Sequence, residues 1–231
     1  MSLAGEGMIA IWNGVTTDLR DEIYEWHNRE HMPERVGIAG FRRGRRYIAI
    51  DADVEFFTLY ETDTPLVHTG SDYTARLNDP TPWTQRMIRG FLDTSRSLCR
   101  VAASFGPGQG GLLVTYRYDI MPGKEELQRH LLAHQVLPVL AERPGVVGAH
   151  LGIADAAASS VETAEKKDIA KPLVPNWVIL VEGGSEATAL LTACDAALPE
   201  ARLIEAGAAA PIRRGLYRLQ YARVKTARAA G

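Results

Sequence analysis

The stretch from Trp26 to Tyr47 carries the side chains of this sequence that are best suited to chemistry. His27, Glu30 and His31 follow one another as H-x-x-E-H, the signature of one class of zinc peptidase. Histidines four residues apart lie on one face of a helix, so both can reach one metal ion. A catalytic zinc also needs a third protein ligand, and the sequence marks no distinctive one. We therefore expect neither a tightly bound metal nor another cofactor here.

Pro33 changes the meaning of these histidines. A proline disfavours helical geometry at Met32 and removes one hydrogen bond of the helix, so we expect the helix to end or kink near His31. The negative end of a helix dipole favours the imidazolium form, which predicts a raised pKa for His31 and a role in proton transfer. His27 or Glu30 would orient it. The alternative is that both histidines are structural and pair with nearby glutamates or backbone carbonyls.

The next segment, FRRGRRY, alternates in a way that separates its side chains. In a strand, one face would carry Phe41, Arg43, Arg45 and Tyr47, and the other Arg42, Gly44, Arg46 and Ile48. The paired N–H donors of arginine suit a carboxylate, an enolate or a phosphate, so we expect Arg43, Arg45 and Tyr47 to bind substrate. The alternative is that the arginines are solvated or paired with glutamates of the preceding helix. Gly44 predicts a bulge or a close approach.

The elements that must position these residues repeat along the chain. The pattern predicts strands at 8–15, 41–50, 55–62 and 97–105, and helices at 17–31 and 83–92. It then predicts strands at 111–120, 146–154, 176–184 and 212–223, and helices at 124–140 and 186–198. Both halves therefore read βαββαβ. This is the ferredoxin-like order, in which two helices cover one face of a four-stranded antiparallel sheet.

We expect an α+β protein built from two fused ferredoxin-like modules, residues 8–106 and 112–225, with a glycine-rich linker at 107–111. Their open sheet faces would meet as a barrel, either within one chain or between two chains of a homodimer. Asn13 is costly to bury unpaired, so it is expected at the lumen or rim of that barrel, binding substrate. The long insertion at 155–175 in the second module suggests a lid over one barrel mouth.

The first helices of the two halves match in their histidines. In each half two histidines four residues apart precede a proline: His27, His31 and Pro33, then His130, His134 and Pro138. The chain has six histidines in all, so this match supports a duplication. The second half lacks counterparts of the tryptophan, the glutamate and the arginines, and the sequence leaves open which half carries a working site.

The motif WHNREHMPERVGIAGFRRGRRY, with FTLYE at 57–61, resembles the EthD-like branch of the dimeric α/β-barrel superfamily. The motif covers about a tenth of the chain, whereas the βαββαβ order covers nearly all of it. At the level of fold, the chain is also similar to muconolactone isomerases, antibiotic-biosynthesis monooxygenases and haem-binding barrel proteins. The resemblance implies a barrel that holds a small molecule, with a histidine-bearing helix near its mouth.

Composition excludes several classes of protein. The 26 basic and 28 acidic side chains give no one-signed field, so nucleic acid is not an expected partner. Cys99 and Cys194 lie far apart in the chain, which indicates no disulfide framework and favours the cytoplasm. The first residues lack the pattern of a signal peptide, and no apolar run reaches the ~18 residues of a membrane span.

These patterns favour a cytoplasmic enzyme that uses histidine-based acid–base chemistry on a small anionic or carbonyl-bearing organic substrate. In this hypothesis His31 transfers the proton, while Arg43 and Arg45 stabilise negative charge. Two alternatives stay open. One is a non-catalytic metabolite-binding or stress-associated barrel, and the other is a haem-binding barrel with His31 or His134 as axial ligand.

Overall fold

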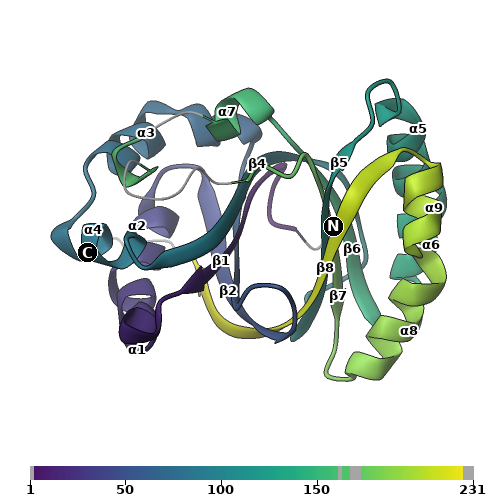
Figure 1. The fold of residues 1–231 in the computed structure, drawn as a ribbon, viewed down its shortest axis with the longest axis horizontal. Helices are drawn as coiled ribbons and strands as arrows, with labels where there is room; N and C mark the ends of the chain where they lie inside the picture. The colour runs from purple at the N-terminus through teal and green to yellow at the C-terminus, as the bar shows by residue number, and fades with distance from the viewer. Residues whose placement is uncertain (1–2, 161–162, 167–172, 226–231) are drawn as a thin grey trace, which may run out of the picture.

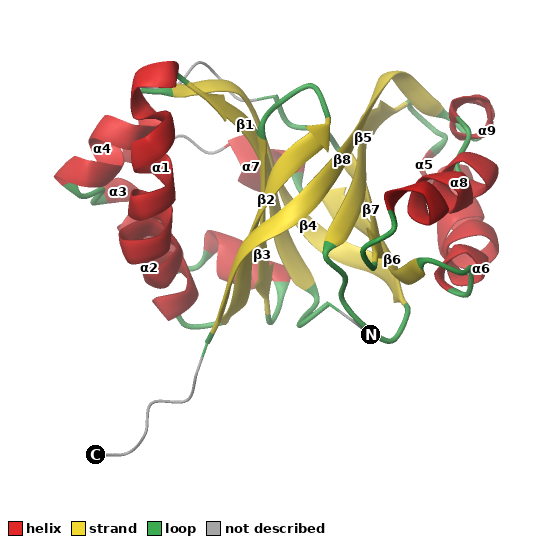
Figure 2. Ribbon diagram, turned by 90° about the horizontal axis from the view of Figure 1, so that it is seen from below, coloured by secondary structure: helices red, strands yellow, loops and turns green. Residues whose placement is uncertain are grey.

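Residues 3–160, 163–166 and 173–225 are described in the computed structural model. Eight strands from these ranges close into a barrel, and helices cover it on two opposite sides (Figure 1, Figure 2). Helices α1 to α4 of the first half lie on one side, whereas α5, α6, α8 and α9 of the second half lie on the other. Among the described residues, no helix is long and apolar enough to cross a membrane.

The eight strands lie near their predicted ranges, but two begin earlier than predicted, at Phe91 and Ala208, and the helix expected at 83–92 ends at Ile88. The helices Ser71–Asn78, Ala156–Ser160 and Glu200–Glu205 were not predicted. The strands are Gly7–Val15 (β1), Phe41–Asp51 (β2), Phe56–Thr62 (β3), Phe91–Phe105 (β4), Leu112–Ile120 (β5), Val146–Ala154 (β6), Trp177–Gly183 (β7) and Ala208–Val224 (β8). The α-helices are Arg20–Trp26 (α1), Met32–Gly37 (α2), Ser71–Asn78 (α3), Pro82–Ile88 (α4), Glu125–His130 (α5), Leu137–Ala141 (α6), Ala156–Ser160 (α7), Ala187–Ala197 (α8) and Glu200–Glu205 (α9). Within the described ranges, the 3-10 segments are Thr17–Leu19 (η1), Pro65–Thr69 (η3) and Ala164–Lys166 (η5), and the π segments are His27–His31 (η2) and Leu131–Val136 (η4).

The two halves of the chain order their strands in the same way. In each half the first strand pairs with the third and the fourth, and the second pairs with the third. The halves join through antiparallel pairs of β2 with β8 and of β4 with β6. The full order is β1-β3-β2-β8-β5-β7-β6-β4, closed by β4 on β1. Of the two arrangements that the sequence left open, the structure shows the barrel that closes within one chain.

The interior of the barrel is packed with side chains. Trp12, Tyr47, Phe57 and Tyr217 are all fully buried there, and the ring centres of Trp12 and Phe57 lie 4.8 Å apart. Leu3, from the N-terminal segment, packs into the same cluster. An eight-stranded barrel is just wide enough for side chains to fill, so among the described residues the interior is a core.

The first helix of each half continues through its proline. A proline within a helix has no amide hydrogen, and its ring collides with the carbonyl four residues earlier. Just before Pro33 the helix widens into the π segment η2, and it then runs on to Gly37 as α2. The segment η4 precedes Pro138 in the same way. Of the predicted end or kink near His31, the end is wrong, because local widening accommodates the proline and the helix continues. Such π segments are frequent at functional sites.

Gly44 lies where β2 passes beneath the first-half helix, which confirms the predicted close approach. A Cβ here would stand 2.9 Å from Met32 Cγ and 3.0 Å from Tyr60 Cε1. Gly44→Ala is therefore expected to lower the free energy of unfolding by about 1–3 kcal/mol through overpacking. The control Gly37→Ala has nothing within 4 Å and adds a better helix former, so it should preserve or raise stability. Equal denaturation midpoints for the two variants would contradict this packing.

The described parts of the insertion pack along the first half of the chain. The Leu98 amide donates to Ser159 Oγ at 2.9 Å, and the Ala164 amide donates to Asn78 Oδ1 at 3.1 Å. The lid hypothesis falls partly on residues 161–162 and 167–172, which lie outside the described residues. What the structure shows is that a second-half segment contributes to the first-half helical layer.

Candidate functional site

The structure separates the predicted site residues onto the two faces of the sheet. Tyr47 belongs to the barrel interior, and Arg43 and Arg45 lie on the same face of β2. His27 and His31 lie on the other side, in the helical layer that covers the outer face of the first-half strands. The predicted residues therefore form two groups and not one site.

Two of the expected placements are wrong because of local strand geometry. A register shift between Phe41 and Arg43 turns Phe41 to the helical side, where it packs with Tyr60. Asn13 lies opposite Phe56 in the β1–β3 ladder, and Phe56 packs in a helical-side cluster. Residues directly opposite each other share a face, so Asn13 faces the helices and not the lumen or rim. Its Nδ2 donates to the Gly14 carbonyl at 3.1 Å.

Arg43 and Arg45 belong to a buried ion-pair network inside the barrel. Arg45 donates to Glu182 through two nitrogens, at 2.8 and 3.1 Å, and to Glu61 Oε1 at 3.1 Å. Arg43 Nε donates to the same Glu61 oxygen at 2.8 Å. Burial alone would raise the pKa of Glu182, but hydrogen bonds from His150 and Arg45 lower that pKa to about 2. These ion-pair partners come from β3 and β7.

His27 and His31 form a close pair under the first helix. Their ring centres are 5.4 Å apart, and the ring of Trp26 lies 4.3 Å from that of His31. Nε2 of His27 is 3.4 Å from the Tyr60 hydroxyl. The Nδ1 atoms of both histidines are buried and have no hydrogen-bond partner among the described residues. A buried polar atom without a partner is costly, so these two nitrogens are suited to contact a ligand.

The fold disfavours the charged form of both histidines, whose pKa values are lowered. Burial, reinforced by Arg46 and Arg35, lowers the pKa of His27 well below 6.5. Burial, followed by Arg35 and His27, also lowers the pKa of His31 well below 6.5. The predicted rise in the pKa of His31 is wrong, because the helix does not end there and because burial and nearby cations oppose a further positive charge.

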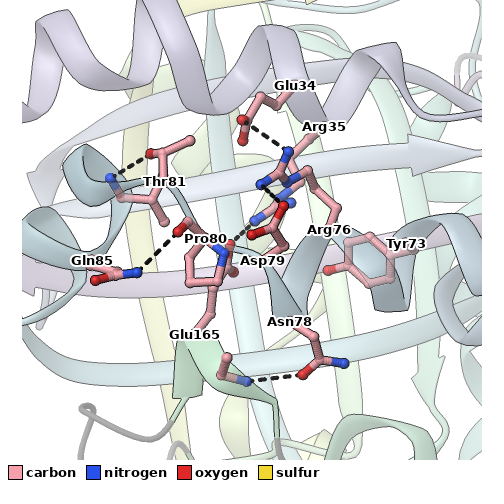
Figure 3. Close-up of polar contacts among 12 residues, drawn as sticks. Glu34, Arg35, Tyr73, Arg76, Asn78, Asp79, Pro80, Thr81, Gln85 and Glu165 are labelled. Atoms are coloured by element: carbon pink, nitrogen blue, oxygen red, sulfur yellow. Dashed lines mark hydrogen bonds and ion pairs between the residues drawn. The ribbon is translucent and has the colours of Figure 1, made fainter.

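Arg35 brings a buried cation to this pair. It follows His31 by one turn of helix, is 2 % exposed, and forms an ion pair with Glu165 of the insertion (Figure 3). Burial disfavours its charge, but attraction to Glu165 outweighs burial and raises the pKa of Arg35. Its Nη1 is buried without a hydrogen-bond partner among the described residues. In the same layer, Arg96 donates a hydrogen bond to the Tyr73 hydroxyl at 2.6 Å.

Arg46 is a second buried cation in the layer, and its hydrogen-bond partners are uncharged. Its Nε donates to Gln220 Oε1 and its Nη2 to Asn28 Oδ1, both at 2.9 Å. The rings of Tyr24 and Tyr221 lie 5.0 and 5.5 Å from the guanidinium carbon. Burial lowers the pKa of Arg46 to about 10. Within the described residues its Nη1 also lacks a hydrogen-bond partner.

The balance of buried charge in the layer is positive. Arg35, Arg46 and Arg96 are each 9 % exposed or less. Glu165 is the one buried carboxylate that the described residues place with them. Buried charges are normally paired, so this excess of cations favours a site for an anionic group.

Glu30, the third member of the histidine motif, holds two helices together. Its carboxylate accepts hydrogen bonds from the hydroxyls of Thr81 and Thr84, at 3.1 Å in the case of Thr84. This ties η2 to the start of α4. In the described part of the chain, no group of three or more His, Cys, Asp or Glu side chains is arranged to hold a metal ion.

The second-half histidines have a different environment. His130 and His134 are exposed, although their ring centres are 5.1 Å apart, much as in the first pair. The two histidine pairs therefore match in sequence spacing but differ in burial. Arg35, Arg46, Tyr60 and Glu165 were not singled out by the sequence. Arg46 belongs to the arginine strand, but Glu165 lies 130 residues from Arg35 and gave no local signal.

Acidification is expected to destabilise the protein through these buried imidazoles. The pKa values of His27 and His31 are lowered by folding, so below about pH 6.5 the unfolded chain binds more protons. The stabilisation is complete above that pH and falls as pH drops, by up to about 1.4 kcal/mol per pH unit for each histidine. His31 is partly exposed and contributes less. His68, with a pKa lowered to about 4 by burial and Arg96, adds to the same slope.

Urea denaturation between about pH 7 and pH 5 measures this slope. The double variant His27→Gln/His31→Gln should flatten it, whereas the exposed control His130→Gln/His134→Gln should leave it unchanged. If the unfolding free energy of the two double variants changed equally with pH, the pKa values of His27 and His31 would not be lowered by folding.

Comparison with known proteins places the fold. No family model and no curated protein matches the chain. A solved structure described as an anthrone oxidase-like protein is similar with a TM-score of 0.66 and 10 % identity, over 97 % of this chain and 95 % of that one. The chain has the dimeric α/β-barrel fold. A proposed monooxygenase from Fusobacterium nucleatum is similar with a TM-score of 0.59 and 10 % identity, over 96 % of each chain. A proposed chlorite dismutase is similar with a TM-score of 0.54 and 14 % identity, over 94 % of this chain and 96 % of that one.

The TM-scores show that the chain shares the fold of these proteins, and the sequence identities are too low to show a shared activity. The predicted fold is confirmed, and membership of the superfamily stays a prediction. The EthD-like branch stays a prediction, because the similar structures do not distinguish it.

Proposed function

We propose that this α/β barrel is an enzyme that uses histidine-based acid–base chemistry on a small anionic or carbonyl-bearing organic molecule. One observation carries the proposal: the buried His27 and the half-buried His31 present buried Nδ1 atoms that have no partner among the described residues, beside an excess of buried arginines. The names of similar structures, an anthrone oxidase-like protein and a proposed monooxygenase, also indicate small-molecule chemistry on this fold. Substrate would lie between the first-half helices and the sheet.

The geometry of the layer supports the following roles. A C–H or O–H bond of the substrate breaks, its electron pair stays on the substrate as an enolate or phenolate, and the proton goes to Nδ1 of His31. Arg35 and Arg46 stabilise the negative charge, in place of Arg43 and Arg45, whose donors contact Glu61 and Glu182. His27, in contact with Tyr60, orients the pair.

Deuterium exchange tests this proposal without knowledge of the product. The protein is incubated in D₂O with a panel of small organic acids that carry an acidic C–H, such as β-keto acids and anthrone-type phenols, and the panel is analysed by mass spectrometry. We expect the wild type to accelerate exchange at one carbon of at least one compound, and Arg46→Gln to weaken the binding of that compound. No acceleration for any compound that binds would contradict an enzymatic role.

A non-catalytic metabolite-binding or stress-associated barrel is the second candidate. The lowered pKa values favour it, because a base with a pKa far below the working pH accepts protons weakly. The same exchange experiment separates the two, since this candidate predicts saturable binding without exchange.

The haem alternative fits the described residues poorly. His134 is exposed. His31 packs against Trp26, and Ile9, Met32 and Leu98 belong to a core cluster of the same helical layer, each 3 % exposed or less. A porphyrin would have to displace these side chains, so we assign no step to haem.

We also propose that the chain consists of two fused ferredoxin-like modules, 8–106 and 112–225, joined by 107–111. The equal strand orders of the halves and the π segments η2 and η4 support a duplication. Cys99 and Cys194 are both free and buried, which supports a reducing compartment such as the cytoplasm.

A further inference from the structure

Arg117 on β5 is a buried cation outside the histidine layer. Its side chain is 3 % exposed, its Nη2 donates to Asp53 Oδ2 at 2.6 Å, and its guanidinium carbon lies 5.0 Å from the ring centre of Trp12. Its Nη1 is buried and finds no hydrogen-bond acceptor among the described residues. A buried cationic N–H without an acceptor is costly, so an acceptor from outside the chain would be favoured here.

A cavity of about 330 Å³ lies at this arginine. It forms where the β5–β8 ladder is interrupted: Arg117 is opposite Arg213, but Asp119 is opposite Ala209, so β8 has extra residues between them. The segment from Leu173 to Pro175 lines the same cavity. Bulges of this kind are frequent beside functional sites, because they open a sheet and redirect side chains.

Two arginines and two aspartates contribute charge at the cavity. Arg117 and Arg213 both donate to a single oxygen of Asp53, at 2.6 and 2.9 Å, so two cations share one carboxylate. Asp119 also lines the cavity, but its Oδ1 already accepts hydrogen bonds from the amide and the side chain of Asn176, at 3.1 and 2.8 Å. At one end of the cavity two guanidinium groups thus share a single carboxylate, whereas Asp119 is hydrogen-bonded to Asn176 instead.

We propose that this cavity binds a small organic monocarboxylate. The carboxylate would accept hydrogen bonds from Arg117 and Arg213, and the apolar body would pack on Val174, Pro175 and Pro211, which line the cavity. Inorganic phosphate would leave these apolar walls uncovered, so a carboxylate with a short hydrocarbon chain fits better. The site is independent of the histidine layer and of the reaction proposed there.

Calorimetric titration with hexanoate tests the site, with 1-hexanol as the uncharged analogue. We expect saturable binding of hexanoate, and binding of 1-hexanol weaker by about tenfold or more, because a charge-assisted hydrogen bond is lost. Arg213→Gln, at a half-exposed side chain, should weaken the binding of hexanoate by a similar factor. Its neighbour Arg214, which pairs with Asp195, supplies the matched control Arg214→Gln with unchanged affinity.

Two further variants keep the test decisive. Ala210→Phe, at an exposed residue of the cavity wall, should block hexanoate by filling the space. Arg46→Gln, in the histidine layer, should leave hexanoate binding unchanged. The proposal is overturned if the wild type does not bind hexanoate, if Arg213→Gln and Ala210→Phe both bind it normally, or if Arg46→Gln abolishes binding.

Discussion

Arg45→Met is expected to lower the free energy of unfolding by about 3–5 kcal/mol. Arg45 is 1 % exposed and contacts both Glu61 and Glu182, whose side chains are 1 % and 0 % exposed. Methionine fills similar volume but leaves Glu182 without its two arginine hydrogen bonds in the interior of the barrel. The measurement is denaturant unfolding followed by tryptophan fluorescence, since buried Trp12 reports on the same interior.

The matched control for this prediction is Arg42→Met on the same strand. Arg42 pairs with Asp63 at the surface, where its side chain is 59 % exposed, so the change should stay within about 0.5 kcal/mol. The double variant Arg45→Met/Glu182→Gln should recover part of the loss, because the unpaired carboxylate is gone. A loss for Arg45→Met no larger than for Arg42→Met would show that the network does not hold the barrel together.

His31→Gln is expected to slow deuterium exchange by about 10²–10⁴-fold, the usual contribution of a general base. Glutamine retains polar contacts and much of the size of imidazole, but it cannot accept the proton at Nδ1. Affinity for the exchanging compound should change little, because Arg35 and Arg46 are untouched. This split between rate and binding distinguishes proton transfer from a structural role.

The control for this second prediction is His134→Gln, at the corresponding but exposed position of the second half. It should leave both exchange and binding unchanged. Full activity of His31→Gln on an identified substrate would contradict a catalytic role, and a joint loss of rate, binding and stability would favour the structural interpretation.

The fold was largely predictable because its signals are local. Alternation along each strand and helical spacing between strands predicted an α+β chain of eight strands, which the closed barrel confirms. The glycine-rich stretch and the matched pairs of histidines predicted that the chain consists of two similar halves. Closure within one chain was not predictable, since the pairing of β2 with β8 and of β4 with β6 joins segments far apart in sequence.

The site was less predictable, because it depends on which face each side chain takes. One register shift moved Phe41 away from Arg43, and Asn13 proved to face the helices. The sequence singled out Arg43 and Arg45, whereas the histidines lie with Arg46 of the same strand and with Arg35. The sign of the pKa shift of His31 also depended on burial and on a distant ion pair of Arg35 with Glu165.

The most direct test of the histidine site is ¹⁵N NMR of the imidazole side chains at about pH 6, with and without salicylate as a small anionic carbonyl probe. The account predicts neutral rings for His27 and His31 and a shift of their Nδ1 signals when salicylate is added. Arg46→Gln should remove that shift. Imidazolium signals from either histidine at this pH, or salicylate binding that leaves both Nδ1 signals in place, would contradict the proposed site.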